Sequence, residues 1–305
     1  MKAIRIHDYG GPEVLALEET PQPQAAEGQV LIHVHAAGVN PADWKARAGY
    51  FKQFRPLPFP WIPGLEGAGV IEAVGAGVTQ FQPGQGVFGP FSGAYAEYAV
   101  APASDIQLKP AKLTFEEAAS VPVGALTAWA AVIDTAKVEA GQRVLVHGAA
   151  GGVGLYVVQL ACWKGAHVIG TTSAANADFA RSLGAEEVID YAAVSFENIL
   201  HDIDVVIDTV GGDVFERSIH VIRSGGALVS VAARPSPDMG KVQGVHVASA
   251  GRASEEKLVQ ITQLIEAGKI KPYVGKVFPL AEARQAQALS QTGHGRGRIV
   301  LRIAE

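Results

Sequence analysis

Short apolar runs separated by glycine and proline occupy the first third of the chain. They lie at Lys2–His7, Val30–Ala36, Ala68–Val74, Gln85–Phe88 and Ala94–Val100. Runs of this length between turn residues are typical of β-strands in an all-β unit. The pattern therefore predicts a barrel-like β unit at the N-terminal end.

From Thr114 onward the pattern changes. The segment TFEEAASVPVGALTAWAAVIDTA is predicted to be helical, with Thr114 as the N-cap and Glu116 and Glu117 in the first turn. Apolar strands then alternate with helices. The predicted strands are Arg143–His147, His167–Thr172, Glu187–Tyr191, Asp204–Thr209 and Ala227–Ala232. The predicted helices are Val153–Lys164, Asn176–Leu183 and Asp213–Ile222.

Nearly continuous apolar strands that alternate with helices are typical of a parallel sheet covered on both faces. The last part of the chain is predicted to form a helix at Glu255–Ala267 and a strand at Arg298–Ile303. The fold class is therefore α/β, with a doubly wound parallel sheet following the β unit.

Composition narrows the class of protein. The chain has 305 residues, of which 48% are hydrophobic and 18% charged, which suits about two domains. A net charge of −5 gives no electrostatic reason to expect a nucleic-acid partner. Cys162 is the single cysteine, so neither an internal disulfide nor a four-cysteine zinc site can form. We expect a soluble, cytoplasmic protein without signal peptide or membrane helix.

The motif HGAAGGVG at His147–Gly154 follows one predicted strand and opens a helix. Glycines in such a turn let the backbone approach a pyrophosphate, toward which the helix directs its free N–H groups. Many glycine-rich turns bind nothing, but the strand–turn–helix context favours a dinucleotide. The candidate cofactor-binding residues here are Gly148, Ala150, Gly151, Gly152, Val153 and Gly154.

The end of the second predicted strand bears on the choice of cofactor. Sites for NAD usually place an acidic residue there, whereas this chain has Thr171, Thr172 and Ser173. Hydroxyls without a carboxylate remove the repulsion that a 2′-phosphate would meet. Arg181 and Tyr191 are candidate partners for that phosphate, although Arg181 could equally be a solvated helix residue. The pattern favours NADPH over NADH.

Ordered motifs along the whole chain resemble the quinone oxidoreductase branch, zeta-crystallin-like and zinc-free, of the medium-chain dehydrogenase/reductase superfamily. They are GVNPAD from Gly38, PGLEGAG from Pro63, YAEY from Tyr95, GALTAW from Gly124, the glycine loop, LGAEEVIDY from Leu183, DTVGG from Asp208, GKIKP from Gly268 and GRIVL from Gly297.

The resemblance implies a GroES-like catalytic domain at 1–115 and a Rossmann NADP-binding domain at 116–265. The C-terminal segment, 266–305, would return to the catalytic domain, with the active site between the two domains. Members of the family are commonly dimers or tetramers, so a homo-oligomer, and here a dimer, is expected.

Zinc relatives ligate their metal with a cysteine and a histidine at positions that match Asn40 and Leu65. Glu66 alone is too few ligands for a catalytic zinc, so we expect a zinc-independent enzyme.

By resemblance, the candidate catalytic residues are Asn40, Tyr50 and Thr127. Asn40 would donate its amide to a substrate carbonyl, although Asn-Pro is also a common turn start. Thr127 would meet the nicotinamide end of the cofactor, or else bond its own helix backbone. Tyr50 would line the substrate pocket, pass a proton to the product, or simply pack among the aromatic residues of its loop.

Further cofactor contacts are predicted at the ends of the fourth and fifth strands, at Val210, Gly211 and Ala232. At the position where the family usually has a basic residue, this chain has Asn176. The missing positive charge weakens the expected preference for NADPH. Arg298, and with it Arg296, is a candidate compensating cation.

The sequence thus predicts hydride transfer from NADPH to a quinone or an α,β-unsaturated carbonyl (an enone or enal). The alternative is an NADPH-binding sensor or structural, crystallin-like protein with little turnover. A zinc alcohol dehydrogenase is disfavoured by Asn40 and Leu65.

Overall fold

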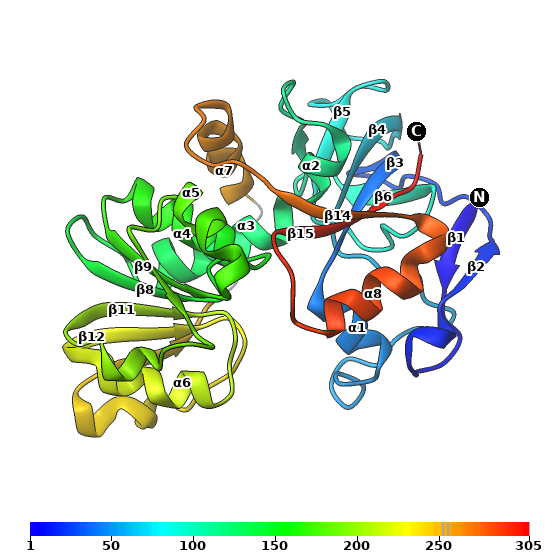
Figure 1. Cartoon of the computed structure of the whole chain (residues 1–305). Helices are drawn as coiled ribbons and strands as arrows, with labels where there is room; N and C mark the ends of the chain where they lie inside the picture. The colour runs from blue at the N-terminus through cyan, green and yellow to red at the C-terminus, as the bar shows by residue number, and fades with distance from the viewer. Residues whose placement is uncertain (252, 255, 305) are drawn as a thin grey trace. The chain divides into compact units, whose positions relative to one another are not determined.

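The computed structural model describes residues 1–251, 253–254 and 256–304. Contacts within the chain divide it into two compact units (Figure 1). The first unit comprises Met1–Val123, Leu258–Glu266 and Pro272–Glu305, and the second comprises Gly124–Lys257 and Ala267–Lys271. Each unit is described by itself below.

Strands dominate the first unit. They are β1 (Lys2–Arg5), β2 (Ala16–Glu19), β3 (Gln29–Val39), β4 (Gly67–Val74), β5 (Gly86–Gly89), β6 (Tyr98–Pro102), β7 (Gln107–Leu108), β14 (Val274–Pro279) and β15 (Arg298–Arg302). β1 and β2 form an antiparallel pair, and the larger sheet runs β14-β15-β3-β4-β5-β7, with β6 also paired to β3. The expected β unit is confirmed.

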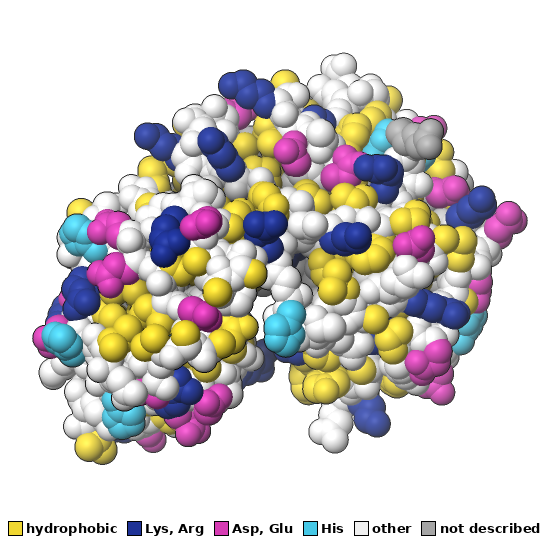
Figure 2. All heavy atoms as spheres, viewed as in Figure 1, with side chains coloured by type: hydrophobic (Ala, Val, Ile, Leu, Met, Phe, Trp, Pro, Cys, Tyr) yellow, Lys and Arg dark blue, Asp and Glu magenta, His cyan; other side chains and the backbone are white. Residues whose placement is uncertain are grey.

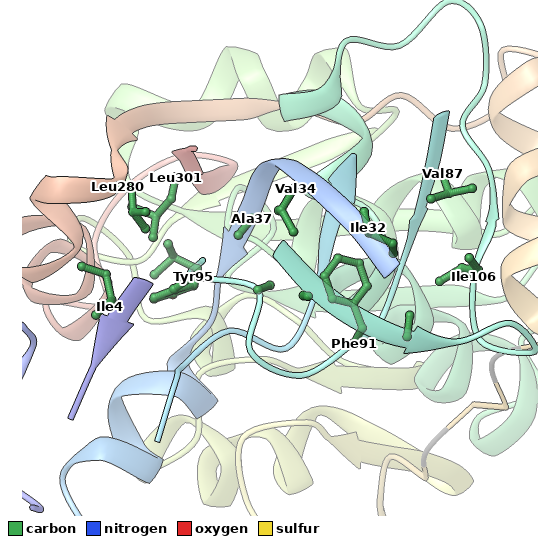
Figure 3. Packing of buried hydrophobic residues seen from close by; sticks show 14 of the residues in the cluster. Ile4, Ile32, Val34, Ala37, Val87, Phe91, Tyr95, Ile106, Leu280 and Leu301 are labelled. Atoms are coloured by element: carbon green, nitrogen blue, oxygen red, sulfur yellow. The ribbon is translucent and has the colours of Figure 1, made fainter. Parts of the chain in front are cut away.

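Ala94–Val100, predicted as one strand, is a strand only from Tyr98 onward. Residues 94–96 before it are fully buried but make only an isolated bridge, between Ala96 and Ala3. Figure 3 shows Tyr95 among the core side chains, together with Ile4, Leu280 and Leu301. Apolar packing, and not a strand ladder, explains the apolar run at this point.

The helices of the first unit are α1 (Pro41–Arg47), α2 (Phe115–Ala119) and α8 (Ala283–Gln291), and most of α7 (Lys257–Glu266) also belongs to it. α8 packs against α1. The predicted start of α7, Glu255, lies outside the described residues.

The helical segment after Thr114 is interrupted. The Thr114 hydroxyl accepts from the Glu117 amide at 3.1 Å, and the Glu117 carboxylate accepts from the Thr114 amide at 2.9 Å, so the predicted N-cap is confirmed. α2 ends before Pro122, which begins α3 (Pro122–Trp129). α3 continues as a π-helical segment at Ala130–Thr135. Because α2 packs on β3 and β4, the division between units falls after Val123 and not at 115.

The second unit contains one six-stranded parallel sheet. Its strands are β8 (Arg143–His147), β9 (His167–Thr172), β10 (Glu187–Asp190), β11 (Ile203–Asp208), β12 (Ile222–Ser230) and β13 (His246–Ser249). Their order is β10-β9-β8-β11-β12-β13, so the chain reverses direction across the sheet between β8 and β11. This order defines a doubly wound sheet and confirms the predicted class. β13 was not anticipated from the sequence.

The helices of the second unit that follow the sheet strands are α4 (Gly154–Trp163), α5 (Ala177–Ser182) and α6 (Asp213–Ser218). α4 and α5 lie on one side of the sheet and α6 on the other (Figure 1). Short 3₁₀ turns complete the described elements at Pro12–Val14, Ala174–Asn176, Phe196–Asn198, Ile219–Val221, Pro237–Gln243 and Leu280–Glu282.

Among the described residues, no helix is both long enough and apolar enough to cross a membrane. On the face shown in Figure 2, Lys and Arg side chains are interspersed with Asp and Glu side chains.

Candidate functional site

The glycine loop lies at the carboxyl end of β8, where the strand order reverses. Gly148 has a φ of +71°, the left-handed region that glycine adopts without strain. A Cβ on Gly154 would stand 2.0 Å from the Gly148 carbonyl oxygen, so this position also requires glycine. The Gly151 amide donates to that same oxygen at 2.9 Å. The sequence thus folds into the tight turn that its glycines predict.

The N-terminus of α4 is suited to an anion. Val153 is its N-cap residue and supplies no side-chain capping bond. The first amides of a helix have no partner within the helix, and together with the helix dipole they attract negative charge. Ala150, Gly151, Gly152 and Val153 are thus placed where a pyrophosphate is expected. This geometry fits a dinucleotide.

His147 is a buried residue at the start of the glycine loop and connects the neighbouring elements. Its ring is buried and lies between the hydroxyls of Thr171 (Nδ1 to Oγ1, 3.0 Å) and Ser218 (Nε2 to Oγ, 2.9 Å). The Ser218 hydroxyl donates to the Val214 carbonyl, so it must accept from Nε2–H, and Nδ1 must then accept from Thr171. Burial lowers the pKa of His147 to about 4. The ring is therefore neutral and fastens β8 to β9 and α6.

Asp208 and Ser230 shape the two loops that carry Val210, Gly211 and Ala232. One oxygen of the buried Asp208 accepts from the amides of Val210 and Gly211, each at 2.9 Å. The other accepts from the Ser230 hydroxyl at 2.8 Å, and Ser230 Oγ in turn accepts from the Ala232 amide at 3.2 Å. The buried hydrogen bond between Ser230 and Asp208 thus links the loop of Val210 and Gly211 to the loop of Ala232.

The residues predicted to distinguish NADPH from NADH gather around the end of β9. The Thr172 side chain is buried, and its carbonyl accepts from the Tyr191 amide at 3.2 Å. The Ser173 hydroxyl accepts from Asn176 at 3.2 Å. Arg181 pairs with the fully exposed Asp178 at 2.9 Å. That surface pair is weak, so the guanidinium can exchange partners readily.

In the first unit, Asn40 is the N-cap residue of α1, but its side chain makes no capping bond. Its Nδ2 instead donates to Glu66 Oε1 at 2.8 Å, and its Oδ1 accepts from Arg298 Nη2 at 2.9 Å. Arg298 Nη2 also donates to Glu66 Oε1, which closes a ring of three hydrogen bonds. All three side chains are buried. We call Asn40, Glu66 and Arg298 the polar triad.

The position of Arg298 changes its predicted role. Its side chain is 3% exposed and is paired with Glu66 inside the first unit. A guanidinium already neutralised by a buried carboxylate has little charge to offer a 2′-phosphate. We therefore withdraw Arg298 from the cofactor-binding residues and assign it to the polar triad.

Asp43 lies next to the triad and is completely buried. Its Oδ2 accepts from the Asn40 amide at 2.8 Å and from the Tyr95 hydroxyl at 3.1 Å. Burial raises the pKa of Asp43 to about 7, and these two hydrogen bonds oppose that shift only in part. Burial, followed by the nearby Asp43 charge, also raises the pKa of Tyr95 above its ordinary value. The group beside Asn40 is therefore a carboxyl that titrates near neutral pH.

The other two predicted catalytic residues differ in environment. Tyr50 follows α1 and is 66% exposed, with its ring edge-on to Trp44 at 5.8 Å between centroids. Phe54, in the same loop, is 71% exposed. Two large exposed aromatic rings on one loop are available to a flat apolar ligand. Thr127 lies in α3 of the second unit and is half-buried.

The residues at the family's zinc positions do not suit that metal. Asn40 and Leu65 offer no thiolate or imidazole. Both oxygens of Glu66 are already engaged, Oε1 by the triad and Oε2 by the Val123 amide at 2.7 Å. Within the described part of the chain, no three His, Cys, Asp or Glu side chains cluster in a way that could hold a metal ion.

Comparison with known proteins defines the class. Residues 26–111 match the family described as alcohol dehydrogenase GroES-like domain, and residues 183–301 match the family described as zinc-binding dehydrogenase. The two units are therefore a GroES-like domain and a Rossmann-type domain, as predicted.

Individual relatives show to which branch of the family the chain belongs. A quinone oxidoreductase from Sus scrofa is 35% identical over 97% of this chain and 95% of its own length. The NADPH-dependent alkenal/one oxidoreductase of Arabidopsis thaliana chloroplasts is also 35% identical, over 99% of this chain and 79% of its own. The structure of the quinone oxidoreductase from Coxiella burnetii superposes with a TM-score of 0.90 at 36% identity, covering 99% of both chains. This chain belongs to the quinone oxidoreductase branch of the medium-chain dehydrogenase/reductase superfamily and is an oxidoreductase.

Several residues at these sites were not assigned a role from the sequence, among them Glu66, Asp208, Ser230, Asp43 and His147 as a support of the loop. The GLE and DTVGG motifs contain the first two, but no local signal in the sequence shows which buried group each carboxylate holds.

Proposed function

We propose that this protein transfers hydride from NADPH to a quinone or an α,β-unsaturated carbonyl, without zinc. The observation that carries the proposal is the polar triad, which holds a neutral amide donor at a position where zinc relatives place a metal ligand. The names of the pig and plant relatives support the two substrate classes.

In this mechanism the protein binds, orients and polarises. The amides at the start of α4, with Gly211 and Ala232, hold the dinucleotide. The cofactor supplies the hydride when it is bound. Asn40 donates an N–H to the substrate carbonyl oxygen, where negative charge develops during reduction. Thr127 contributes a hydroxyl at the nicotinamide end of the cofactor.

Tyr50 lines the substrate pocket in this proposal and is a candidate proton donor to the reduced product. General-acid help contributes about 10²–10⁴ in rate. Tyr50→Phe removes the hydroxyl and keeps the ring, so a loss in that range supports proton donation. A smaller loss assigns Tyr50 to packing against the substrate.

NADPH is the proposed cofactor because Ser173, and not a carboxylate, directly follows β9. The phosphate would meet the Thr172 and Ser173 region and draw on Arg181 and Tyr191, which are both more than half exposed. Arg181→Ala is expected to weaken NADPH binding while leaving NADH binding nearly unchanged. Equal loss for both cofactors would contradict this assignment.

The direct test is to follow oxidation of NADPH, with NADH in parallel, against benzoquinone, phenanthrenequinone, alkenals, enones and saturated aldehydes. Turnover of quinones or enones, with saturated aldehydes inert and activity insensitive to chelators, supports the proposal. Tight NADPH binding without oxidation by any acceptor would overturn it and favour a sensor or structural role. Saturated products indicate reduction of the alkenal double bond, whereas radical products indicate one-electron quinone reduction.

We also propose a homodimer that acts in the cytoplasm, by analogy with the family. Light scattering after size-exclusion chromatography tests the dimer, and a monomer at micromolar concentration would contradict it.

A further inference from the structure

The strand registers of the first unit explain how the polar triad assembles. β15 pairs antiparallel with β3, and Ile299 lies opposite Val39, so Arg298 lies beside Asn40 just past the end of β3. β4 pairs with β3 from the other side, with Gly67 opposite Ala37, which brings Glu66 to the same place. Three strands thus deliver one amide, one carboxylate and one guanidinium to a single buried point.

Gly38 makes room for the carboxylate. A Cβ at this residue would lie 2.3 Å from Glu66 Oε1 and 2.8 Å from the Ala119 carbonyl oxygen. Its φ is not in the left-handed region, so the need for glycine here is steric. The backbone is therefore shaped around the Glu66 carboxylate and not only around the sheet.

The closed ring of hydrogen bonds fixes the orientation of the Asn40 amide. The Glu66 carboxylate requires a donor, Nδ2–H, on one side, and the Arg298 guanidinium requires an acceptor, Oδ1, on the other. A flipped amide would place its oxygen against the carboxylate and its NH₂ against the guanidinium, so both hydrogen bonds would be lost. The guanidinium bond to Oδ1 also polarises the amide and strengthens its N–H groups as donors. Nδ2 carries a second hydrogen, which makes no hydrogen bond to any described residue.

We propose that Glu66 and Arg298 are positioning residues, which lock the Asn40 amide with its second N–H directed to the substrate carbonyl. This inference rests on the proposed function. Neither residue touches substrate or cofactor in this assignment, and both act on the reaction only through Asn40. Their loss should therefore lower kcat and leave NADPH affinity in the second unit unchanged.

A double-mutant cycle separates positioning from general damage. Glu66→Gln and Arg298→Lys are each combined with Asn40→Ala, and kcat, KM, the Kd for NADPH and the thermal midpoint are measured for every variant. Asn40→Ala is expected to lower kcat by about 10²–10³. Glu66→Gln and Arg298→Lys should each alone lower kcat at least tenfold, which is roughly half the free-energy effect of Asn40→Ala. Neither should lower kcat further when Asn40 is already alanine.

Arg47→Lys is the matched control. Arg47 is also a fully buried arginine of the first unit, but its guanidinium donates to Gln287, to the Gly10 carbonyl and to Gln291, and not to a member of the triad. It is expected to lower the thermal midpoint and to change kcat by less than about twofold, with the same small change in the Asn40→Ala background.

The outcomes distinguish this inference from the proposed function. If Asn40→Ala loses about 10²–10³ in kcat but Glu66→Gln or Arg298→Lys lowers the residual kcat further in that background, positioning is overturned and the reductase stands. If Asn40→Ala keeps wild-type kcat, the role of Asn40 fails, and the inference with it. Should Glu66→Gln fold poorly, Arg298→Lys carries the same cycle, because lysine keeps the charge but loses the planar fork.

Discussion

The two units bury polar groups in opposite ways. The first unit buries charge: Glu66 and Arg298 are ionic partners, and Asp43 titrates near neutral pH beside them. The second unit buries neutral hydrogen-bonding groups around His147, and the one carboxylate buried among its described residues, Asp208, is satisfied by backbone amides and Ser230. In the first unit the buried ion pair orients a side chain, whereas in the second unit the buried groups, Asp208 included, shape the backbone.

The difference follows from what each unit must present. The second unit presents backbone amides, whose direction is fixed by strand ends and a glycine turn. The first unit presents a side-chain amide, which can flip unless unlike partners hold its two ends. Burying charge costs desolvation free energy but orients the groups that pair with it. Removal of one charged partner leaves the other unpaired and is strongly destabilising.

The largest expected effect is the loss of stability caused by Glu66→Leu. This change leaves Arg298 buried without its carboxylate and should destabilise the first unit by about 3–5 kcal/mol. Hydrogen exchange of peptides from β3 and β15 measures the loss. The control is Glu116→Leu, which breaks the pair with the half-exposed Arg302 and should lose about 1 kcal/mol or less. Equal losses for the two variants would show that the triad is not held by charge.

In the second unit, Gly154→Ala should weaken NADPH binding by roughly 100-fold, or about 2.7 kcal/mol. The new methyl would collide with the Gly148 carbonyl and displace the loop. Gly251→Ala is the control, because no described residue apart from its chain neighbour lies within 4 Å of its Cβ position. Titration calorimetry gives both affinities. Similar Kd values for the two variants would contradict a tight backbone cradle.

Asp43 predicts a pH dependence for the first unit. Its pKa in the folded protein, about 7, exceeds its ordinary value of 3.8, so the folded state holds the proton more tightly. Stability from this group is therefore fully present below pH 3.8 and is lost as pH rises from 3.8 to about 7. The stability of Asp43→Asn relative to wild type should therefore increase between pH 5 and pH 8, by on the order of 2 kcal/mol. Hydrogen exchange of α1 at matched pH tests this, and a constant difference would refute it.

His147 predicts a smaller effect of opposite sign in the second unit. Its pKa in the folded protein, about 4, is below its ordinary value of 6.5, so the unfolded chain binds the proton more readily. Stability is then lost as pH falls from about 6.5 toward 4. In His147→Gln the amide can replace one of the two bonds, and the acid sensitivity of β8 peptides should decrease by about 1.4 kcal/mol per pH unit between pH 6 and pH 5. If the acid sensitivity of the β8 peptides is unchanged in His147→Gln, a group other than His147 causes it.

Local motifs made most of the second unit predictable. The strands and helices around the glycine loop were placed within a few residues, because each apolar run is short and bounded by turn residues. The helical segment after Thr114 was harder: its N-cap was predicted, but the break at Pro122 was not, because the apolar pattern continues across it. The strand predicted from Ala94 failed in its first half, where the residues are buried by packing without a ladder.

The sequence by itself determined the α/β class, the glycine loop, the family, and Asn40 as a candidate donor, because each depends on neighbouring residues or ordered motifs. Only the tertiary structure decided what surrounds that donor. Arg298 lies 258 residues from Asn40 and was assigned to a phosphate from the sequence. Pairing of β15 with β3 sets the two side by side, and strand register is a property of the folded sheet that no local pattern in either segment encodes.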